Sequence, residues 1–377
     1  MIRNVFVLNV GSSSVKYKVL DADTGEVFAD GIIERIGEYG SPVPDHAAAL
    51  ELVRGQNPGA VMEAVGHRVV HGGTRFVRAT LIDDEVEAEI EALADLAPLH
   101  NPPALAGIRA ARAALPDLPH VAVFDTAFHA TISPAARDYA IDADVAARTR
   151  IRRFGFHGTS HRYVSRVAAE VLGRVGDPQL KLVVLHLGNG ASATAVQGGR
   201  SLDTSMGLTP LEGLVMGTRS GDIDPAIPLY LAREHGYTTE QLDELLNRRS
   251  GLLGLSGRSD MRELVAAAES GDERARHALD VYVHRLRRYI GGYAAELGGI
   301  DALVFTAGVG ENSDYIRRRA VAGLEFLGLS IDPELNAVRS HEPRFISPAG
   351  SPAAVLVIPT NEELEIARET QAAVAQG

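Results

Sequence analysis

A short segment near the N-terminus combines a glycine, three hydroxyl side chains and a lysine. It reads Asn9-Val10-Gly11-Ser12-Ser13-Ser14-Val15-Lys16 and lies between two apolar stretches. Backbone N–H and serine O–H groups in such a turn can bind a phosphate, and Lys16 adds a positive charge. The glycine and lysine are not spaced as in a Walker A loop, and a strand rather than a helix follows. The segment is therefore either a phosphate-binding turn or a plain hairpin turn.

Two further glycine-rich turns occur in the second half of the chain. Gly188-Asn189-Gly190 fits a relaxed dinucleotide fingerprint, but residues 192–196 predict a strand where that motif needs a helix. We interpret it as a second hairpin loop. Gly308–Asn312 lies between an apolar strand and a helix predicted from Ser313, so its N–H groups could bind an anion or a nucleotide. The alternative for this segment is a tight strand-to-helix turn.

Two arginines are predicted to lie in polar turns beside glycine. Arg68 belongs to Gly66–Gly73, and Arg219 belongs to Met216–Asp222. A guanidinium binds a carboxylate or phosphoryl group through two parallel hydrogen bonds, and neighbouring glycines let the backbone approach a ligand. Most arginines are only solvated, so neither residue identifies a site by itself.

Two histidines, His157 and His161, are four positions apart. On a helix they share one face, as zinc-binding pairs do, but no glutamate lies beside His157 and the chain has no cysteine. The alternative is an imidazole that faces a phosphate. We expect Thr159 or Ser160 to cap the helix that follows, and the basic stretch Arg148–Arg153 to be solvated.

Acidic residues follow two apolar strands. Asp125 comes directly after residues 121–124, and Glu362 and Glu363 follow residues 354–358. Carboxylates at strand ends commonly anchor Mg²⁺ in phosphoryl transfer. Glu362 and Glu363 also fit the acidic first turn of a helix capped by Asn361, and the two roles are compatible.

The elements that carry these residues repeat along the chain. Residues 5–10, 15–20 and 26–33 predict an antiparallel meander, and residues 181–187 and 191–196 repeat its beginning. Asn9-Val10-Gly11-Ser12 aligns with His186-Leu187-Gly188-Asn189, at an offset of 177 residues. The pattern predicts a duplicated fold with two similar lobes. Because no linker-like segment separates them, we expect the lobes to touch across a cleft.

Helices alternate with the remaining strands. Strands are expected at residues 121–124, 302–306 and 354–358. Helices are expected at residues 83–94, 104–115, 161–172, 239–246, 273–297, 313–324 and 361–374. This alternation is typical of the α/β class.

Composition limits the function classes. The 377 residues are 45% hydrophobic and 23% charged, as in a globular protein of about two domains. The net charge of −12 argues against nucleic acid or an anionic membrane as the main partner. No apolar run is long enough to span a bilayer, and Val5–Val10 is too short for a signal peptide. The lack of cysteine excludes disulfides, thiolate zinc sites and cysteine nucleophiles. A cytoplasmic protein is the simplest interpretation.

Taken together, the motifs resemble those of the acetate kinase family, in order and over essentially the whole chain. The matching segments are Asn9–Lys16, Gly66–Gly73, Val123–His129, Arg153–His161, His186–Gly190, Met216–Asp222, Gly308–Asn312 and Pro359–Leu364. The resemblance implies a duplicated actin-like (ribonuclease H-like) α/β fold of two lobes with a cleft between them. We expect residues 1–127 plus 363–377 to form the first lobe, and residues 128–362 to form the nucleotide-binding second lobe. The stretch 37–57 looks shorter than in typical members.

The resemblance also implies an activity. It is the reversible transfer of a phosphoryl group between ATP and acetate, by direct in-line displacement with Mg²⁺ or Mn²⁺, in a homodimer. By resemblance, Asn9 and Glu362 help to hold the metal, and Asp125 is the family's proton donor or acceptor. Since acetate is already ionised at pH 7, we expect Asp125 to orient an arginine or the metal ion instead.

The remaining roles follow by the same resemblance. Arg68 and Arg219 are expected to bind the carboxylate and the phosphoryl group, while His157 and Asn189 stabilise the group in transfer. The expected nucleotide contacts are Ser12, Ser14, Lys16, His186, Leu187, Gly188, Asn189, Gly190, Asp260, Met261, Arg262, Gly308, Val309, Gly310, Glu311 and Asn312. The expected pocket for the methyl group consists of Val70, Leu99, Phe156 and Pro210, with Val70 on the same strand face as Arg68.

Three alternatives remain at this point. Propionate kinases carry nearly the same motifs, so the acid is less certain than the reaction. A non-catalytic, actin-like nucleotide-binding module would not use Arg68 and Arg219. A metal-dependent hydrolase built on His157 and His161 would need a third ligand.

Overall fold

The computed structural model describes residues 2–56, 61–98 and 100–376, and it divides the chain into two compact units. The first unit comprises residues 1–130, 158–160 and 361–377, and the second comprises residues 131–157 and 161–360. The boundaries expected from the sequence, 127/128 and 362/363, lie within three residues of these. The assignment of residues 158–160 to the first unit was not expected.

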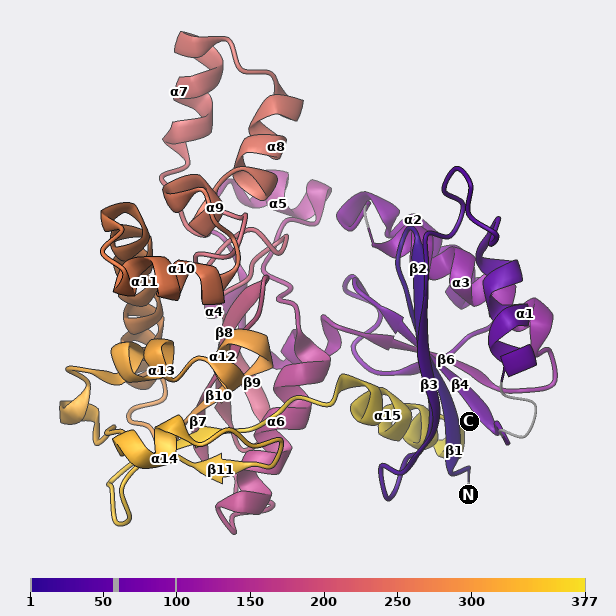
Figure 1. Ribbon diagram of the computed structural model, residues 1–377. Coiled ribbons are helices and arrows are strands. Elements are labelled where there is room, and N and C mark those ends of the chain that lie inside the picture. The colour runs from indigo at the N-terminus through magenta and orange to yellow at the C-terminus, as the bar shows by residue number, and fades with distance from the viewer. Residues whose placement is uncertain (1, 57–60, 99, 377) are drawn as a thin grey trace. The chain divides into compact units, whose positions relative to one another are not determined.

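A six-stranded sheet of order β3-β2-β1-β4-β6-β5 forms the centre of the first unit (Figure 1). Strands β1 to β3 make the predicted antiparallel meander, whereas β1, β4 and β6 run parallel to one another. The strands are β1 (Asn4–Val10), β2 (Ser14–Asp21), β3 (Val27–Glu34), β4 (Ala64–Val69), β5 (Thr80–Leu81) and β6 (His120–Phe124).

Helices cover both faces of this sheet. They are α1 (His46–Gln56), α2 (Asp84–Ala92), α3 (Asn101–Ala114) and α15 (Glu362–Gln376), with short 3₁₀ turns at Ala94–Leu96 and Ala127–Thr131. Phe6, Leu8 and Val10 of β1 pack in one buried cluster with Ala111 of α3. Because side chains alternate along a strand, Asn9 faces the opposite side of the sheet, where α15 packs on β1, β4 and β6.

The second unit repeats this sheet strand for strand. Its order, β9-β8-β7-β10-β12-β11, matches the first sheet, including an antiparallel edge strand after the parallel set. Strand β7 begins at Lys181, 177 residues after β1 begins at Asn4, which confirms the predicted duplication. The strands are β7 (Lys181–Leu187), β8 (Ala191–Gln197), β9 (Arg200–Thr204), β10 (Ala302–Thr306), β11 (Arg344–Phe345) and β12 (Ala354–Val357).

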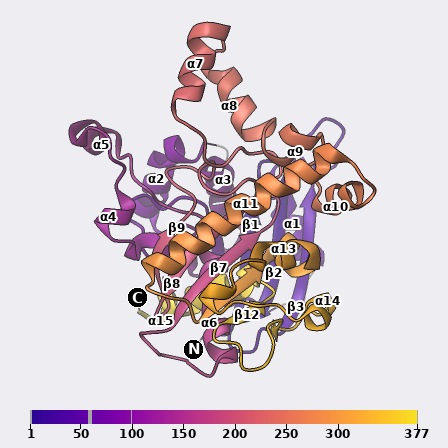
Figure 2. The same ribbon diagram turned by 90° about the vertical axis from the view of Figure 1, so that its left-hand side faces the viewer.

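The second unit carries most of the helices. The long helix α11 packs across β7 and β8 (Figure 2). The helices are α4 (Pro134–Arg137), α5 (Ala143–Thr149), α6 (Gly158–Val171), α7 (Ala226–His235), α8 (Thr239–Arg248), α9 (Gly251–Ser256), α10 (Met261–Glu269), α11 (Glu273–Glu296), α12 (Ala307–Asn312), α13 (Asp314–Val321) and α14 (Pro333–Ala337), with a 3₁₀ turn at Glu325–Leu327. The first three residues of α6 belong to the first unit.

Two motif segments differ from their predicted conformation. Arg68 lies inside β4 rather than in a polar turn, because β4 pairs with β1 on one side and β6 on the other. Pairing on both sides outweighs the weak strand preference of Gly66. Residues 308–312 form most of helix α12, which starts directly after β10, rather than a turn that leads into α13.

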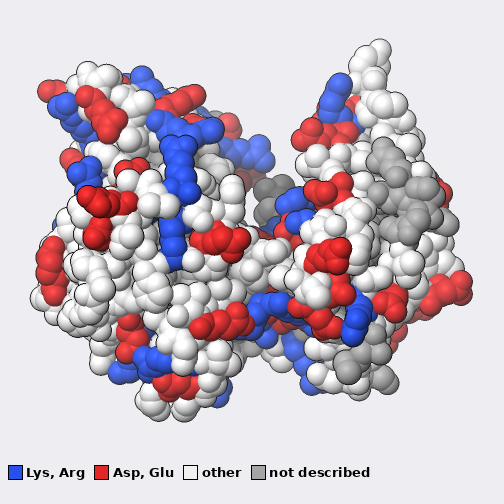
Figure 3. Space-filling model, turned by 60° about the horizontal axis from the view of Figure 1, so that its bottom comes forward, with Lys and Arg blue, Asp and Glu red and all other residues white. Residues whose placement is uncertain are grey.

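No helix in the described ranges is long and apolar enough to cross a bilayer. Acidic and basic side chains lie interspersed on the face of the molecule shown in Figure 3.

Candidate active site

Three side chains of the first unit come from the carboxyl ends of parallel strands. Asn9 lies near the end of β1, Arg68 near the end of β4, and Asp125 directly after β6. Leu8 is paired with His67 and Arg68 with Val123, so strand alternation places Asn9, Arg68 and Asp125 on one face. It is the face on which α15 packs, since a Cβ built on Gly66 would lie 2.5 Å from Thr370 Oγ1 of that helix.

Arg68 and Asp125 form a two-point ion pair. The Arg68 Nη2 and Nε atoms lie 2.7 and 3.1 Å from Asp125 Oδ2, and Thr159 donates to Asp125 Oδ1 at 3.0 Å. The Asp125 side chain is only 2% exposed, against 22% for Arg68. Asp125 raises the pKa of Arg68 far enough to outweigh the effect of burial. Asp125 therefore holds the guanidinium in one orientation.

Gly158 holds the start of α6 against the backbone of Asp125. Its backbone N–H donates to the Asp125 carbonyl at 2.9 Å. A Cβ at this position would lie 2.0 Å from that oxygen, so only glycine fits. The predicted caps of this helix were wrong: Thr159 and Ser160 lie inside it, and His157 is the N-cap residue without a side-chain capping bond. Thr159 instead uses its hydroxyl to hold Asp125.

The start of α15 brings further charges to the same face. Asn361 Oδ1 accepts from the Leu364 N–H at 3.1 Å, as expected of a helix cap. Glu363 forms ion pairs with Lys16 and, at 3.8 Å, with Lys18. Glu362 Oε2 lies 3.7 Å from Arg68 Nη2. Burial raises the pKa of Glu362; Arg68 opposes this shift, and the nearby carboxylates add to it.

The donors on this face suit a magnesium ion. Asn9 and Glu362 both offer oxygen, and a carboxylate whose pKa is raised by burial and by neighbouring carboxylates gains from a nearby cation. Among the described residues, no three His, Asp or Glu side chains could hold a metal by themselves.

In the second unit, three histidines gather around one serine. His157 Nδ1 and His161 Nε2 lie 2.9 and 2.7 Å from Ser192 Oγ. The His157 and His186 rings stack with centroids 4.1 Å apart. His157 has a φ of 55°, which is unusual for a residue other than glycine and is often found at functional sites. Ser192 thus fixes the orientation of the His157 ring through its Nδ1 atom.

Arg219 is a half-buried cation next to His157. Its Nη1 donates to the Pro210 carbonyl at 3.0 Å and lies 3.6 Å from Met216 Sδ. Within the described part of the chain no carboxylate lies within ion-pair distance of it, and burial lowers its pKa. A Cβ built on Gly190 would lie 3.5 Å from Arg219 Nη1 and 3.6 Å from His157 Nε2. Two nitrogen groups therefore face the same small space, which suits an anion.

The loop between β7 and β8 is held against the Arg219 segment. Gly217 donates its N–H to the Asn189 carbonyl at 3.0 Å. A Cβ on Gly217 would lie 2.1 Å from Asn189 Oδ1, so a larger residue at this position would have to displace the Asn189 side chain. In the loop, Gly188, Asn189 and Gly190 are at least partly exposed, whereas Leu187 is fully buried. The corresponding loop of the first unit has Ser12 exposed and Ser14 half-buried.

The expected nucleotide segment around α12 is tied together by Glu311. One carboxylate oxygen accepts from the N–H groups of Ala307 and Thr360, at 2.8 and 3.1 Å. Ala307 has a φ of 63° directly after β10. Gly308 is exposed at the start of the helix and Asn312 is exposed at its end, while Val309 is half-buried and Gly310 buried. Glu311 thus joins the ends of β10 and β12.

The second expected nucleotide segment is the start of α10. Asp260 accepts from the Arg262 backbone N–H at 2.8 Å, and Arg262 Nη2 also bonds to its carboxylate at 2.6 Å. These bonds lower the pKa of Asp260 to about 2. Met261 is buried, so its side chain belongs to the core.

The four residues of the expected methyl pocket do not form one described group. Val70 belongs to the first unit and follows the end of β4, so it is not on that strand as predicted. Phe156, which is buried, and Pro210 belong to the second unit. Leu99 lies outside the described residues. The pocket therefore stays a prediction.

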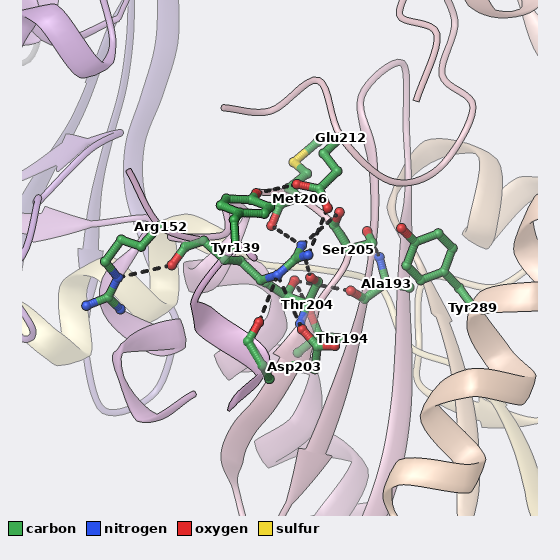
Figure 4. A network of polar contacts seen from close by, with 12 residues as sticks. Tyr139, Arg152, Ala193, Thr194, Asp203, Thr204, Ser205, Met206, Glu212 and Tyr289 are labelled. Atoms are coloured by element: carbon green, nitrogen blue, oxygen red, sulfur yellow. Dashed lines mark hydrogen bonds and ion pairs between the residues drawn. The ribbon is translucent and has the colours of Figure 1, made fainter. Parts of the chain in front are cut away.

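One important residue was misjudged from the sequence. Arg153 was expected to be solvated, but its side chain is only 14% exposed and forms an ion pair with Glu212. Its other contacts include the carbonyls of Thr204, Ser205 and Met206. Figure 4 shows Tyr139, Asp203 and Glu212 gathered in this network. The local sequence does not distinguish Arg153 from Arg148 and Arg150, which belong to the same basic stretch and are exposed.

The chain is similar to known proteins over most of its length. The family model described as "Acetokinase family" matches residues 44–368. The acetate kinase of Leifsonia xyli is 59% identical, over 99% of both chains. The acetate kinase structure from Porphyromonas gingivalis has a TM-score of 0.94 and 41% identity, over 99% of this chain and 100% of that one.

A propionate kinase structure from Francisella tularensis has a TM-score of 0.90 and 41% identity, over 98% of this chain and 99% of that one. The expected fold class, a duplicated actin-like α/β fold of two lobes, is confirmed. The family match, the curated relative and the two structures all extend over most of the chain, so this protein is a member of the acetokinase family.

Proposed function

We propose that this protein is an acetate kinase, which transfers a phosphoryl group reversibly between ATP and acetate to give ADP and acetyl phosphate. The main observation that supports this proposal is the environment of Arg219. This residue is a half-buried guanidinium without a carboxylate partner among the described residues, and it faces the same space as His157 Nε2. A phosphoryl group or a carboxylate would supply the missing negative charge. The family membership and the acetate kinases among the relatives support acetate as the acceptor.

The mechanism is direct in-line transfer. Acetate is ionised at pH 7, so one of its oxygens attacks the γ-phosphorus of ATP without a general base, while the bond from that phosphorus to ADP breaks and ADP leaves. Arg68, oriented by Asp125, binds the acetate carboxylate, while Arg219, His157 and Asn189 stabilise the charge on the phosphoryl group in flight. Positioning and electrostatic stabilisation supply the rate. The nucleotide contacts are those expected from the sequence: Ser12, Ser14, Lys16, His186 to Gly190, Asp260 to Arg262 and Gly308 to Asn312.

A divalent cation, Mg²⁺ or Mn²⁺, would be held by Asn9 and Glu362. When bound, it would neutralise charge on the ATP phosphates.

Glu362→Gln should raise the Mg²⁺ concentration needed for half-maximal activity by about tenfold, because an amide is a weaker ligand than a carboxylate. In the native protein this concentration should also rise as the pH falls. Burial raises the pKa of Glu362, so at lower pH the cation must displace a proton. A Mg²⁺ titration of activity at several pH values measures both effects.

The matched control for this experiment is Glu363→Gln. Glu363 is in the same helical turn but is paired with Lys16 and Lys18. The control should change the Mg²⁺ titration far less than Glu362→Gln does, because Glu363 adds to the raised pKa of Glu362 but is not a proposed ligand. If Glu362→Gln lowers only the melting temperature, Glu362 serves the helix and not the cation.

The methyl group of acetate requires an apolar pocket, for which we propose Val70, Leu99, Phe156 and Pro210. Val70→Ala should improve kcat/KM for propionate relative to acetate by about tenfold, with little change in kcat for acetate, because the smaller side chain makes room for one methylene. Steady-state kinetics with both acids measure the ratio. Equal damage to both acids would make Val70 a packing residue.

We further propose a homodimer, with the arm formed by α7 and α8 as its contact surface. Neither helix contains a buried residue, and Figure 1 shows the two helices projecting from the second unit. Ile227, Leu229 and Tyr230 are 42, 60 and 53% exposed on α7, and exposed apolar patches commonly mark protein contacts.

Leu229→Arg should therefore shift the protein from dimer to monomer in sedimentation velocity. The control Val175→Arg changes another exposed apolar residue, which belongs to neither α7 nor α8, and should leave the dimer intact. A monomeric native protein would contradict the proposal.

The proposed function is tested by an acyl phosphate assay with ATP, Mg²⁺ and a panel of short carboxylates. Acetate should give the highest kcat/KM. The main alternative is a propionate kinase, for which the Francisella tularensis relative is the precedent, and a preference for propionate in the panel would establish it. No acyl phosphate from any acid would exclude the kinase altogether. Because ATP is the phosphoryl donor, we propose a cytoplasmic location.

A further inference from the structure

We infer that Arg153 is a positioning residue for Arg219 and acts through the polypeptide segment 204–212. This inference rests on the proposed function, in which Arg219 meets the phosphoryl group. Arg153 itself touches neither Arg219 nor any residue that we place at the reacting atoms. Its effect must therefore pass through the intervening chain, and every contact on that route lies within the second unit.

The route begins at the Arg153 guanidinium. Its Nη1 donates to the carbonyls of Thr204 and Met206 at 2.8 and 3.2 Å, and its Nη2 donates to Glu212 Oε1 at 2.8 Å. Its Nε lies 3.6 Å from Asp203 Oδ1. Burial alone would lower the pKa of Arg153, but Glu212 and Asp203 outweigh it and raise the pKa, so the residue stays charged. One cation thus holds both ends of segment 204–212.

Tyr139, which lies between α4 and α5, also binds segment 204–212. Its hydroxyl forms a hydrogen bond with Glu212 Oε2 and accepts from the Leu208 N–H at 3.0 Å. Figure 4 shows the Tyr139 ring and the Glu212 carboxylate side by side. The backbone N–H groups of Phe154 and Gly155 also donate to the Gly207 carbonyl, at 3.0 and 3.2 Å. The first half of segment 204–212 is therefore held at several points.

The far end of the segment is fixed as well. The Gly213 N–H donates to Asp222 Oδ1 at 2.8 Å, and the Asp222 N–H donates back to the Gly213 carbonyl at 3.0 Å. Arg285 Nη1 donates to the same carbonyl at 3.0 Å. Residues 209–211 thus form a short span between two anchored ends.

Pro210, in the middle of that span, makes the final contact. Its carbonyl accepts from Arg219 Nη1 at 3.0 Å, and the other contact of this atom is Met216 Sδ at 3.6 Å. Because no carboxylate among the described residues orients Arg219, the Pro210 carbonyl sets where the guanidinium lies. A displacement of about 1 Å in a group that positions or stabilises the reacting atoms can cost about 10²-fold in rate. The Arg153 network therefore determines how well Arg219 meets the phosphoryl group.

The test is a double-mutant cycle between Glu212→Gln and Arg219→Ala. Glu212→Gln removes the charge that pairs with Arg153, and we expect it to lower kcat about 10²-fold with KM for ATP within about twofold of the native value. In the Arg219→Ala background, the same change should alter kcat by less than about twofold, since the residue through which it acts is gone. Tyr139→Phe should also lower kcat, by a smaller factor, and only when Arg219 is present.

A purely structural role would behave differently. It would lower the melting temperature or the active fraction, and it would reduce kcat by the same factor in both backgrounds. That result would overturn the inference, as would an unchanged kcat in Glu212→Gln. If Glu212→Gln does not fold, the cycle is run with Tyr139→Phe, which keeps the ring and removes one hydroxyl.

The control is Arg174→Lys. Arg174 pairs with Asp177 and Asp301 in the same unit but makes no contact with segment 204–212, so its replacement should leave kcat unchanged. The native protein is assayed in parallel. If the native protein makes no acyl phosphate, the proposed function fails. If the native protein does make acyl phosphate but Glu212→Gln lowers kcat by the same factor in both backgrounds, only the inference fails.

Discussion

Arg219→Ala should lower kcat by about 10³-fold, the lower end of the range for an arginine that stabilises phosphoryl transfer. Its guanidinium has no carboxylate partner in the described part of the chain, so its charge is available to the phosphoryl group in flight. The melting temperature should change little, because the side chain contributes only its contacts with Pro210 and Met216. Steady-state kinetics at saturating ATP and acetate measure the effect.

Arg219→Lys should restore little of this activity. An ammonium group is a point charge and cannot donate two parallel hydrogen bonds as the planar guanidinium does. Arg200→Ala, which removes an exposed arginine of the same unit, is the control and should retain full activity. An Arg219→Lys enzyme with the native kcat would show that charge alone is needed and would refute the proposed role.

The second large effect is expected for Asp125→Asn, which should lower kcat/KM for acetate by about 10²-fold or more. The amide that replaces the carboxylate would keep one acceptor but would direct its NH₂ group toward Arg68, which can only donate, or toward Thr159, which now donates to Asp125 Oδ1. Arg68 would then lose the two-point pairing that orients it, although Glu362 lies 3.7 Å away. Kinetics with acetate as the varied substrate measure the loss.

The pH dependence of the residual activity distinguishes orientation from base catalysis. If Asp125 only orients Arg68, the residual rate of Asp125→Asn should not depend on pH beyond the dependence of the native enzyme. If Asp125 removes a proton, hydroxide should replace it, and the residual rate should rise about tenfold per pH unit. The second outcome would contradict our mechanism, in which acetate is already ionised.

Most of the longer strands and helices could be predicted because they depend on short-range patterns, but α1, α7, α10, β4 and β9 were not among the expected elements. The meander at β1 to β3 and its repetition at β7 and β8 follow from apolar stretches interrupted by glycine turns. The Asn361 cap and the acids after it mark the start of α15. Asp125 could be recognised because a carboxylate directly follows a buried strand.

The errors occurred where distant segments decide the conformation. Gly66 and Arg68 lie in a strand because β1 and β6 pair with β4 on both sides, which local preference does not report. Thr159 resembles a helix cap in the sequence, but its hydroxyl bonds to Asp125, 34 residues earlier. Val70, which was expected on the strand, follows its end.

By itself, the sequence determined the duplicated α/β fold, most of its longer strands and helices and the residue types available for chemistry, since these depend on periodicity and on motifs read along the chain. The tertiary structure alone decided which of several similar side chains acquires a specific environment. Arg148, Arg150 and Arg153 look alike in the sequence, yet only Arg153 is held by Glu212 and by carbonyls more than fifty residues away. The reason is physical: burial and pairing of a charge depend on segments that folding brings together, and no local pattern encodes them.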